Sequence, residues 1–250
     1  MKYIINENQY KLLKEYVQDG FSFDVLDSIE DLDEKDAYCR KYLGEPVGHG
    51  VARNVYDFDE ETVLKLNFGS FHYNSNKTEW NNVAKLSKRF DIFPKYYKHA
   101  DDFSWIICES VIPLQPYDCN IILGIPFSID DDMNWDNWKE NYKQYITQEI
   151  CNNVSLIGFV YWAAERSWNK KFFINSIKQY FNDFTEKYIK KVENKYMLLM
   201  QGKHGEWFKK LYDYIINCKG YPDLHKGNFG IVRRNGKETI VIIDCGEAEY

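Results

Sequence analysis

The chain has no cysteine pairing pattern and no excess of positive charge, and each absence argues against a class of protein. Its six cysteines, at positions 39, 108, 119, 151, 218 and 245, are scattered and form no Cys-x-x-Cys pair. This usage is typical of reduced thiols in a cytoplasm and argues against a disulfide-stabilised scaffold. The formal net charge of −6 argues against a nucleic-acid partner.

Long hydrophobic runs are also lacking. The longest, from Leu156 to Ala164, is too short to cross a bilayer, and the N-terminus shows no signal-peptide pattern. No internal repeat or low-complexity segment is present. With 250 residues, the chain is long enough to bury a sizeable core. We therefore expect a cytoplasmic protein without a membrane partner.

Near its C-terminal end the chain carries two short polar motifs separated by a hairpin signal. Asp223-Leu224-His225-Lys226-Gly227-Asn228 comes first, and Ile243-Asp244-Cys245-Gly246 follows. Between them, the runs Phe229 to Val232 and Glu238 to Ile243 flank an Asn235-Gly236 pair, which is the strongest short-range hairpin signal. Either motif alone is commonplace, but the ordered pair predicts one rigid edge that carries both.

The two motifs resemble the catalytic and metal-binding loops of the protein-kinase-like superfamily. Their wording is closest to the aminoglycoside and choline kinase branch, where a His stands two places after the catalytic Asp. The resemblance implies that Asp223 orients the acceptor hydroxyl and that Asn228 and Asp244 hold magnesium. Carboxylate and amide oxygens suit this cation, and phosphoryl transfer depends mainly on positioning and charge neutralisation.

An earlier stretch resembles the nucleotide-binding loop of the same family. Gly48 and Gly50 lie between two strand-like runs, and Val55 stands where the family places an apolar residue under the adenine. Glycines let backbone N–H groups approach phosphates closely. The third glycine of the family is replaced by Arg53. Taken alone, two glycines in a Gly-x-Gly pair are most often a simple turn.

A lysine in the next run resembles the residue that holds the α- and β-phosphates. Thr62 to Leu66 alternates like a strand and carries Lys65 among apolar residues. In the family, a Glu on the following helix fixes this Lys. Glu79 lies in a stretch whose apolar positions 80, 83 and 86 recur at helical spacing, so the resemblance implies a Lys65–Glu79 ion pair. Each residue alone is also compatible with a solvated position.

Two further runs, Phe93 to Tyr97 and Trp105 to Leu114, are predicted to be strands that lead into a hinge. The resemblance implies that this hinge runs from Glu109 to Val111 and that backbone groups of Glu109 and Val111 bind the adenine. The alternative is one more buried strand followed by a proline-containing loop.

The remaining segments are predicted to be helical. One or two short helices are expected before residue 40, the better one ending at Val17, and more helices between Trp135 and Lys219. One apolar stripe at three- and four-residue steps is formed by Phe173, Ile177, Tyr180, Phe181, Phe184, Tyr188 and Val192. A last helix from Trp207 to Cys218 is expected to end at Gly220. The basic stretches at 187–191 and 209–210 are interpreted as solvated helix faces.

An acidic cluster, Asp130 to Asp132 with Asp136, allows two interpretations. It is either a cap and dipole partner of the next helix or, by resemblance to the small-molecule kinases, part of a cleft for a cationic acceptor.

These features predict an α+β, protein-kinase-like two-lobed fold. Its expected parts are an N-terminal helical extension (1–40), a small antiparallel β nucleotide lobe (41–112) and a mainly helical second lobe (113–250). Tyr221-Pro222 stands where protein kinases have His-Arg, and four residues follow Gly246. We therefore expect a chain truncated after the Asp-x-Gly element, without an activation segment.

The expected activity is ATP- and magnesium-dependent transfer of the γ-phosphoryl group to a hydroxyl of an unidentified small molecule or protein. Two alternatives stay open. A catalytically weak kinase-like binding protein is favoured by Arg53 and the short tail, and transfer of the nucleotide (AMP) is an activity that the same fold supports.

Overall fold

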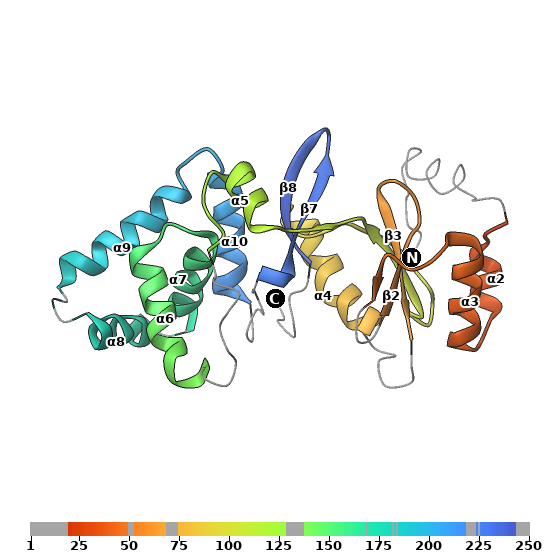
Figure 1. The fold of residues 1–250 in the computed structure, drawn as a ribbon, viewed down its shortest axis with the longest axis horizontal. Helices are drawn as coiled ribbons and strands as arrows, with labels where there is room; N and C mark the ends of the chain where they lie inside the picture. Colours follow the sequence, from red (N-terminus) through yellow and green to blue (C-terminus); the bar gives the residue numbers. More distant parts are fainter. Residues whose placement is uncertain are drawn as a thin grey trace. The chain divides into compact units, whose positions relative to one another are not determined.

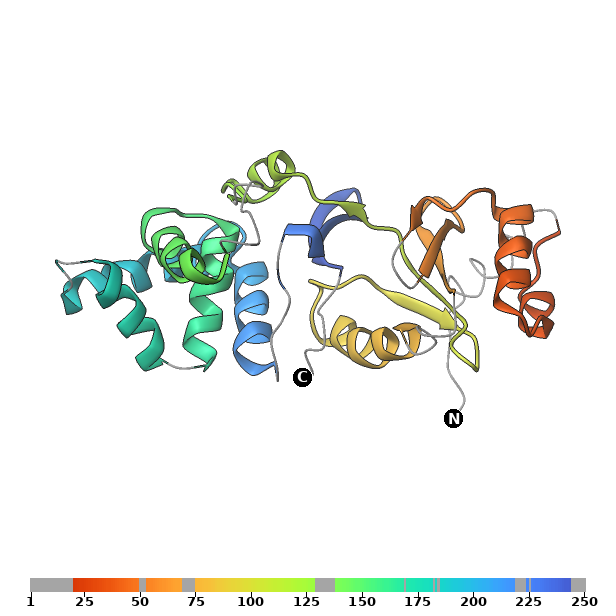
Figure 2. The same ribbon diagram turned by 60° about the horizontal axis from the view of Figure 1, so that its bottom comes forward.

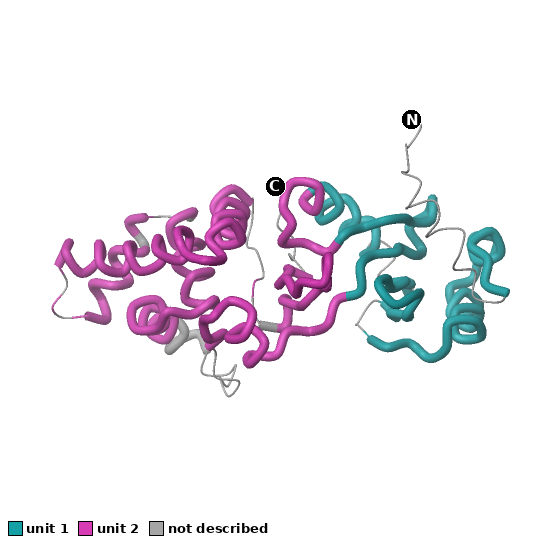
Figure 3. The backbone as a smooth tube through the Cα atoms, turned by 90° about the horizontal axis from the view of Figure 1, so that it is seen from above, with its two compact units in different colours: residues 1–85, 95–110 teal, residues 86–94, 111–250 magenta. Residues whose placement is uncertain are grey.

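The protein is described here by a computed structural model that covers residues 20–49, 53–68, 75–128, 138–168, 170–181, 183, 185–218, 224 and 226–243. A five-stranded antiparallel sheet is followed by a mainly helical region, so the α+β class is confirmed (Figure 1). The chain divides into two compact units, coloured in Figure 3. Unit 1 contains residues 1–85 and 95–110, and unit 2 contains residues 86–94 and 111–250.

The sheet of unit 1 has the strand order β1-β2-β3-β5-β4, and all neighbouring strands are antiparallel. The strands are β1 (Gly48–His49), β2 (Arg53–Asp57), β3 (Thr62–Asn67), β4 (Tyr96–His99) and β5 (Trp105–Glu109). Asp59 closes the turn between β2 and β3, because its side chain accepts hydrogen bonds from the backbone N–H groups of Glu61 (2.8 Å) and Thr62 (2.7 Å). The run around Lys65 is therefore a strand, as predicted.

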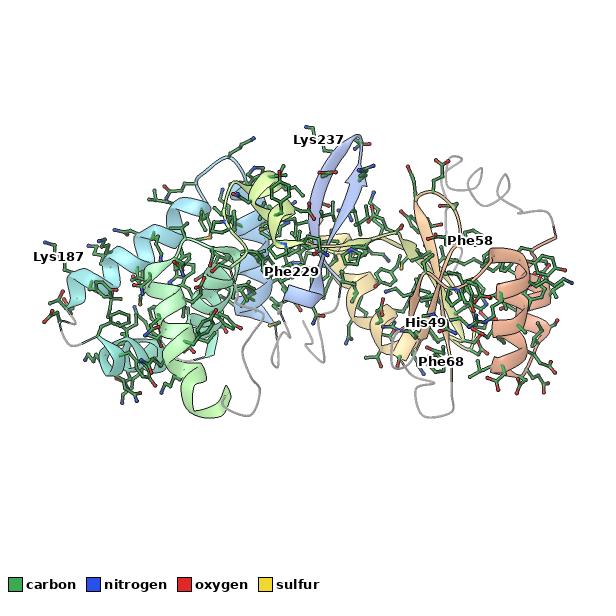
Figure 4. The ribbon with its side chains drawn as sticks, viewed as in Figure 1. His49, Phe58, Phe68, Lys187, Phe229 and Lys237 are labelled. Carbon is green, nitrogen blue, oxygen red and sulfur yellow. The ribbon has the colours of Figure 1, made fainter. Side chains whose placement is uncertain are left out.

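Two N-terminal helices cover one face of this sheet. Ser22 caps α2 (Phe23–Ser28), and Asp31 caps α3 (Leu32–Leu43) by accepting from two backbone N–H groups. The helices and the sheet share a buried cluster of Phe21, Leu26, Cys39, Tyr56, Phe58, Leu64, Leu66, Ala100, Trp105 and Ile107. Phe58 is labelled in Figure 4. These helices thus share a core with the sheet, whereas the helix expected before Val17 lies outside the described residues.

Helix α4 (Ser75–Arg89) lies beside strand β4, as Figure 2 shows. Its Trp80 ring contacts the rings of Tyr96 (6.0 Å between centroids) and His99 (4.4 Å). Val83 and Leu86 of the predicted helical spacing are buried. The predicted helix that carries Glu79 is therefore confirmed.

In unit 2, strands β7 (Phe229–Arg234) and β8 (Lys237–Ile242) form the predicted hairpin, with Lys237 at its tip and Phe229 at its base (Figure 4). Both turn residues, Asn235 (φ 52°) and Gly236 (φ 71°), have positive φ, which is the geometry that an Asn-Gly pair favours. Strand β6 (Ile112–Pro113) pairs with β7. The run predicted as one strand from Trp105 to Leu114 is therefore divided between two sheets.

The other described elements of unit 2 are mainly helical, as predicted. Its helices are α5 (Pro116–Leu123), α6 (Trp138–Asn152), α7 (Leu156–Trp168), α8 (Lys170–Tyr180), α9 (Glu186–Leu199) and α10 (Gly205–Asn217). The apolar run that begins at Leu156 forms buried α7. Among the helices of the described ranges, none combines the length and apolar character needed to cross a membrane.

The predicted apolar stripe from Phe173 to Val192 does not lie on one helix. Helix α8 ends at Tyr180, and Thr185 starts α9 by accepting a hydrogen bond from the Tyr188 backbone N–H (3.3 Å). The capping threonine starts a new helix, but the apolar residues continue at the same three- and four-residue steps. The apolar spacing alone therefore does not reveal the break between the helices. Phe184 and Gly220, the expected end of the last helix, lie outside the described residues, as does the acidic cluster at 130–136.

Candidate functional site

Three of the residues expected to bind a nucleotide lie in one row across the sheet of unit 1. Gly48 of β1 is the direct partner of Val55 in β2, and Val55 is the direct partner of Lys65 in β3. Directly opposite residues in antiparallel strands project from the same face. Leu64 and Leu66 point into the core shared with α2 and α3, so Lys65 lies on the opposite face of the sheet.

The expected ion pair between Lys65 and Glu79 is present. The Lys65 Nζ donates to Glu79 Oε1 over 2.6 Å, and the two side chains are only 12 % and 10 % exposed. A lysine at a solvated strand position would not be enclosed in this way. The pairing is therefore confirmed, while the catalytic role of the two residues stays a prediction.

Two further side chains bind the same carboxylate. The Arg53 guanidinium donates to Glu79 Oε2, and the Tyr96 hydroxyl donates to Oε1, the oxygen that Lys65 also binds. Sequence reasoning missed Tyr96 as a site residue and treated Arg53 only as a departure from the family's glycine. The only available signal for Tyr96 was its place in a strand next to the helix that carries Glu79, and this does not give the direction of a hydroxyl.

Asn76 ties the first turn of α4 to strand β3 and to the residue that precedes β5. Its fully buried amide Nδ2 donates to the backbone carbonyls of Lys65 (3.1 Å) and Ser104 (3.2 Å). Because a buried amide loses free energy when its hydrogen bonds are not made, these contacts fix the position of the turn. Glu79 therefore projects from a helix that is anchored one turn earlier to the strand of its partner Lys65.

The electrostatics keep the pair charged. Burial alone raises the pKa of Glu79, but the charges of Lys65 and Arg53 outweigh this effect and lower it to about 2. Burial opposes the charged form of Lys65 as well, yet the neighbouring Glu79 helps to raise its pKa above the ordinary value. Burial also raises the pKa of Tyr96 well above 10, and that of the nearby Cys108 thiol to about 11. At neutral pH one anion and two cations thus share the cluster with a neutral hydroxyl and a neutral thiol.

The predicted hinge coincides with the passage of the chain from unit 1 to unit 2, between Ser110 and Val111. The Glu109 N–H donates to the Lys95 carbonyl (2.8 Å), and the Ser110 N–H donates to the Glu61 carbonyl (2.7 Å). Both amides are therefore used within unit 1. Val111 is the first residue after this passage, and the binding of its backbone to adenine stays a prediction.

The expected metal ligands fall at the base of the hairpin in unit 2. The Asn228 residue is nearly buried, and its backbone carbonyl accepts from the N–H of Ile243 (2.8 Å), which directly precedes Asp244 in the chain. Asp223, Asp244 and Gly50 lie outside the described residues. Within the described ranges, no group of three or more His, Cys, Asp or Glu side chains is placed to hold a metal ion.

The lysines of α9 form an open surface, as expected for a solvated face. A groove of about 700 Å³ runs along this helix and is lined by Asp183, Thr185, Lys187, Tyr188, Lys190, Lys191, Asn194, Lys195 and Leu198. Figure 4 labels Lys187 on α9. All these lining residues come from one helix and the residues just before it, so within the described part of the chain no second element encloses a ligand there.

Comparison of the sequence with protein-family models and with curated proteins finds no match. The site residues and their geometry are therefore the basis for inferring a function.

Proposed function

We propose that the protein is an ATP- and magnesium-dependent phosphotransferase with a protein-kinase-like fold. The observation that carries this proposal is the enclosed Lys65–Glu79 ion pair, formed between a strand and the helix that follows it. The pair is the one that the resemblance implies. Its place beside Gly48 and Val55 in one cross-strand row supports the same interpretation.

We infer that residues of unit 1 hold the phosphates of a nucleoside triphosphate. A lysine whose charge is maintained by a buried carboxylate is a fixed cation for phosphate oxygens, and its attraction is strong because the surroundings are poorly solvated. Gly48 keeps the backbone next to Val55 free of a side chain. The resemblance further implies that the backbone of Val111, a residue of unit 2, binds the adenine.

The proposed metal ligands are Asn228 and Asp244, and Asp223 is the proposed base that orients the acceptor hydroxyl. An amide and a carboxylate oxygen are hard ligands of the kind that magnesium takes. When bound, magnesium supplies positive charge that neutralises the phosphates during transfer. Asn228 is held in place by the hairpin base, which suits a ligand that must be fixed in orientation.

Binding of Mg-ATP is the first test. A ligand that binds only the native state stabilises it by RT ln(1 + [L]/Kd), which is about 2.7 kcal/mol at a hundredfold excess over Kd. We expect Mg-ATP to raise the melting temperature, and Lys65→Met to weaken this shift. Arg166→Met is the matched control, because Arg166 forms an ion pair in the helical region of unit 2. No shift for the unmodified protein at millimolar Mg-ATP would refute the proposal.

The position of the phosphate label that is transferred identifies the class of reaction. ATP labelled at the γ-position transfers the label to an acceptor in a cell extract if the protein is a kinase, whereas only α-labelled ATP does so if it transfers AMP. Binding without transfer of either label identifies the weak kinase-like binding protein. Arg53, at the position where the family has its third glycine, is the feature that favours this last alternative.

A further inference from the structure

Glu79 receives donors from three different strands. Lys65 comes from β3, Arg53 from β2 and Tyr96 from β4, and all three reach the carboxylate on α4. The donors are divided between the oxygens, since Arg53 binds Oε2 while Lys65 and Tyr96 bind Oε1. An ion pair between a lysine and a glutamate alone needs only one of these oxygens.

We propose that Arg53 and Tyr96 are positioning residues, which hold the Glu79 carboxylate by both of its oxygens and thereby fix Lys65 for the phosphate chain of a nucleotide. This inference rests on the proposed function. It gives Arg53 a role in holding the site together, at the position where the family that the chain resembles has a glycine.

A carboxylate held through a single oxygen rotates about its last bond and carries its partner with it. The lysine ammonium is a point charge on a flexible four-carbon stem, so it gains its position from whatever binds it. The guanidinium of Arg53 binds Oε2 and also lies within 3.4 Å of the Asn76 side-chain oxygen in the same helix. Arg53 thus connects the carboxylate to the anchored first turn of α4.

Tyr96 acts from the opposite edge of the site. Its ring packs edge-on against Trp80 of α4, so the hydroxyl is directed by packing as well as by its hydrogen bond. The phenol carries no charge at neutral pH, because burial and Glu79 raise its pKa well above 10. Tyr96 therefore restrains Glu79 and leaves the negative charge of Glu79 available to Lys65.

The experiment compares the affinities of adenosine, ADP and ATP, each with magnesium, by titration calorimetry. Arg53→Met and Tyr96→Phe each remove a hydrogen bond to a charged group and leave Lys65 in place. We expect the ATP affinity to fall about tenfold in each variant, while the adenosine affinity stays unchanged. Arg53→Lys retains a cation and restores part of the ATP affinity, whereas Arg53→Gly behaves like Arg53→Met.

Arg166 provides the matched control. It is 28 % exposed against 23 % for Arg53, and it also binds a glutamate, Glu193, together with a tyrosine hydroxyl, that of Tyr212. Arg166→Met is expected to lower the melting temperature without changing the ratio of ATP to adenosine affinity. This ratio separates a positioning role from a structural one, since general loss of folded protein weakens both ligands alike.

Two results would overturn the inference but not the proposed function. Either the unmodified protein binds ATP and both variants bind it equally well, or the ATP and adenosine affinities fall together in the variants. If the unmodified protein binds no nucleotide, the proposed function fails and the inference fails with it. The two failures are thus distinguished by the unmodified protein.

Discussion

The protonation states of single residues in this protein depend on burial and on neighbouring charges, which act in opposite directions. Burial favours a neutral Glu79, yet two cations within bonding distance hold its pKa near 2. The sequence pattern predicted one of these cations, Lys65, because the family that the chain resembles pairs a lysine of this strand with a glutamate on the following helix. The pattern gave no reason to expect Arg53 or Tyr96, since no local spacing links them to position 79.

Gly48 is a residue whose substitution tests function apart from stability. A Cβ at this position would lie 3.5 Å from the Cβ of Val55, which is an ordinary van der Waals contact, and its φ is not among the positive values. We therefore expect Gly48→Ala to leave the free energy of unfolding within about 0.5 kcal/mol, as for other unstrained surface changes. The added methyl stands in the row with Val55 and Lys65, so the affinity for Mg-ATP is expected to fall.

Gly44 supplies the contrast for that measurement. Its φ of +89° disfavours any side chain, although nothing lies within 4 Å of a Cβ built there. Gly44→Ala should lower the melting temperature and leave the affinity of the folded protein for Mg-ATP unchanged. A large loss of stability in Gly48→Ala would show that this glycine is structural.

The association of β6 with β7 depends on a glycine at their contact. A Cβ on Gly230 would lie 2.3 Å from Val111 Cγ1, 2.8 Å from the Ile112 carbonyl oxygen and 2.8 Å from Ile243 Cδ1. The Ile112 carbonyl belongs to the backbone and cannot move without breaking the pairing of the two strands. We expect Gly230→Ala to lower the free energy of unfolding by about 1–3 kcal/mol, as overpacking typically does, measured by urea denaturation. Stability equal to that of the unmodified protein would mean that β6 does not pair closely with β7.

Elements with a local signal could be predicted from the sequence, and elements set by distant contacts could not. The β7–β8 hairpin followed from its Asn235-Gly236 pair, and helix α4 followed from its apolar spacing. The break between α8 and α9 was missed, because the apolar steps continue through it and only the capping of α9 by Thr185 marks it.

At the scale of the whole molecule, the division into units is not contiguous along the chain. Residues 86–94 belong to unit 2. Arg234 donates to the carbonyls of Asp91 (2.6 Å) and Phe93 (2.7 Å), and the Ile242 N–H donates to the Ile92 carbonyl (2.7 Å). These bonds join residues more than a hundred positions apart and have no local pattern, so sequence reasoning divided the chain only into consecutive segments.

The stability of the molecule should depend on pH through a half-buried carboxyl, that of Glu165 in α7. Burial raises its pKa from 4.5 to about 7, and the charge of Lys143 opposes this only in part. As the pH rises from about 4.5 to 7, Glu165 loses its proton more readily in the unfolded chain than in the folded one. The free energy of unfolding therefore falls over this range and reaches its lower value above pH 7.

Glu165→Gln removes the ionisation while keeping nearly the same shape. We expect this variant to match the unmodified protein near pH 4.5 and to melt at a higher temperature at pH 8, because the glutamine stays neutral where the buried carboxylate is charged. Glu60→Gln, on an exposed turn of unit 1, is the control and should show no such gain at pH 8. If Glu165→Gln instead shifts the melting temperature equally at both pH values, packing or hydrogen bonding explains the change, and the carboxyl of Glu165 does not titrate with folding.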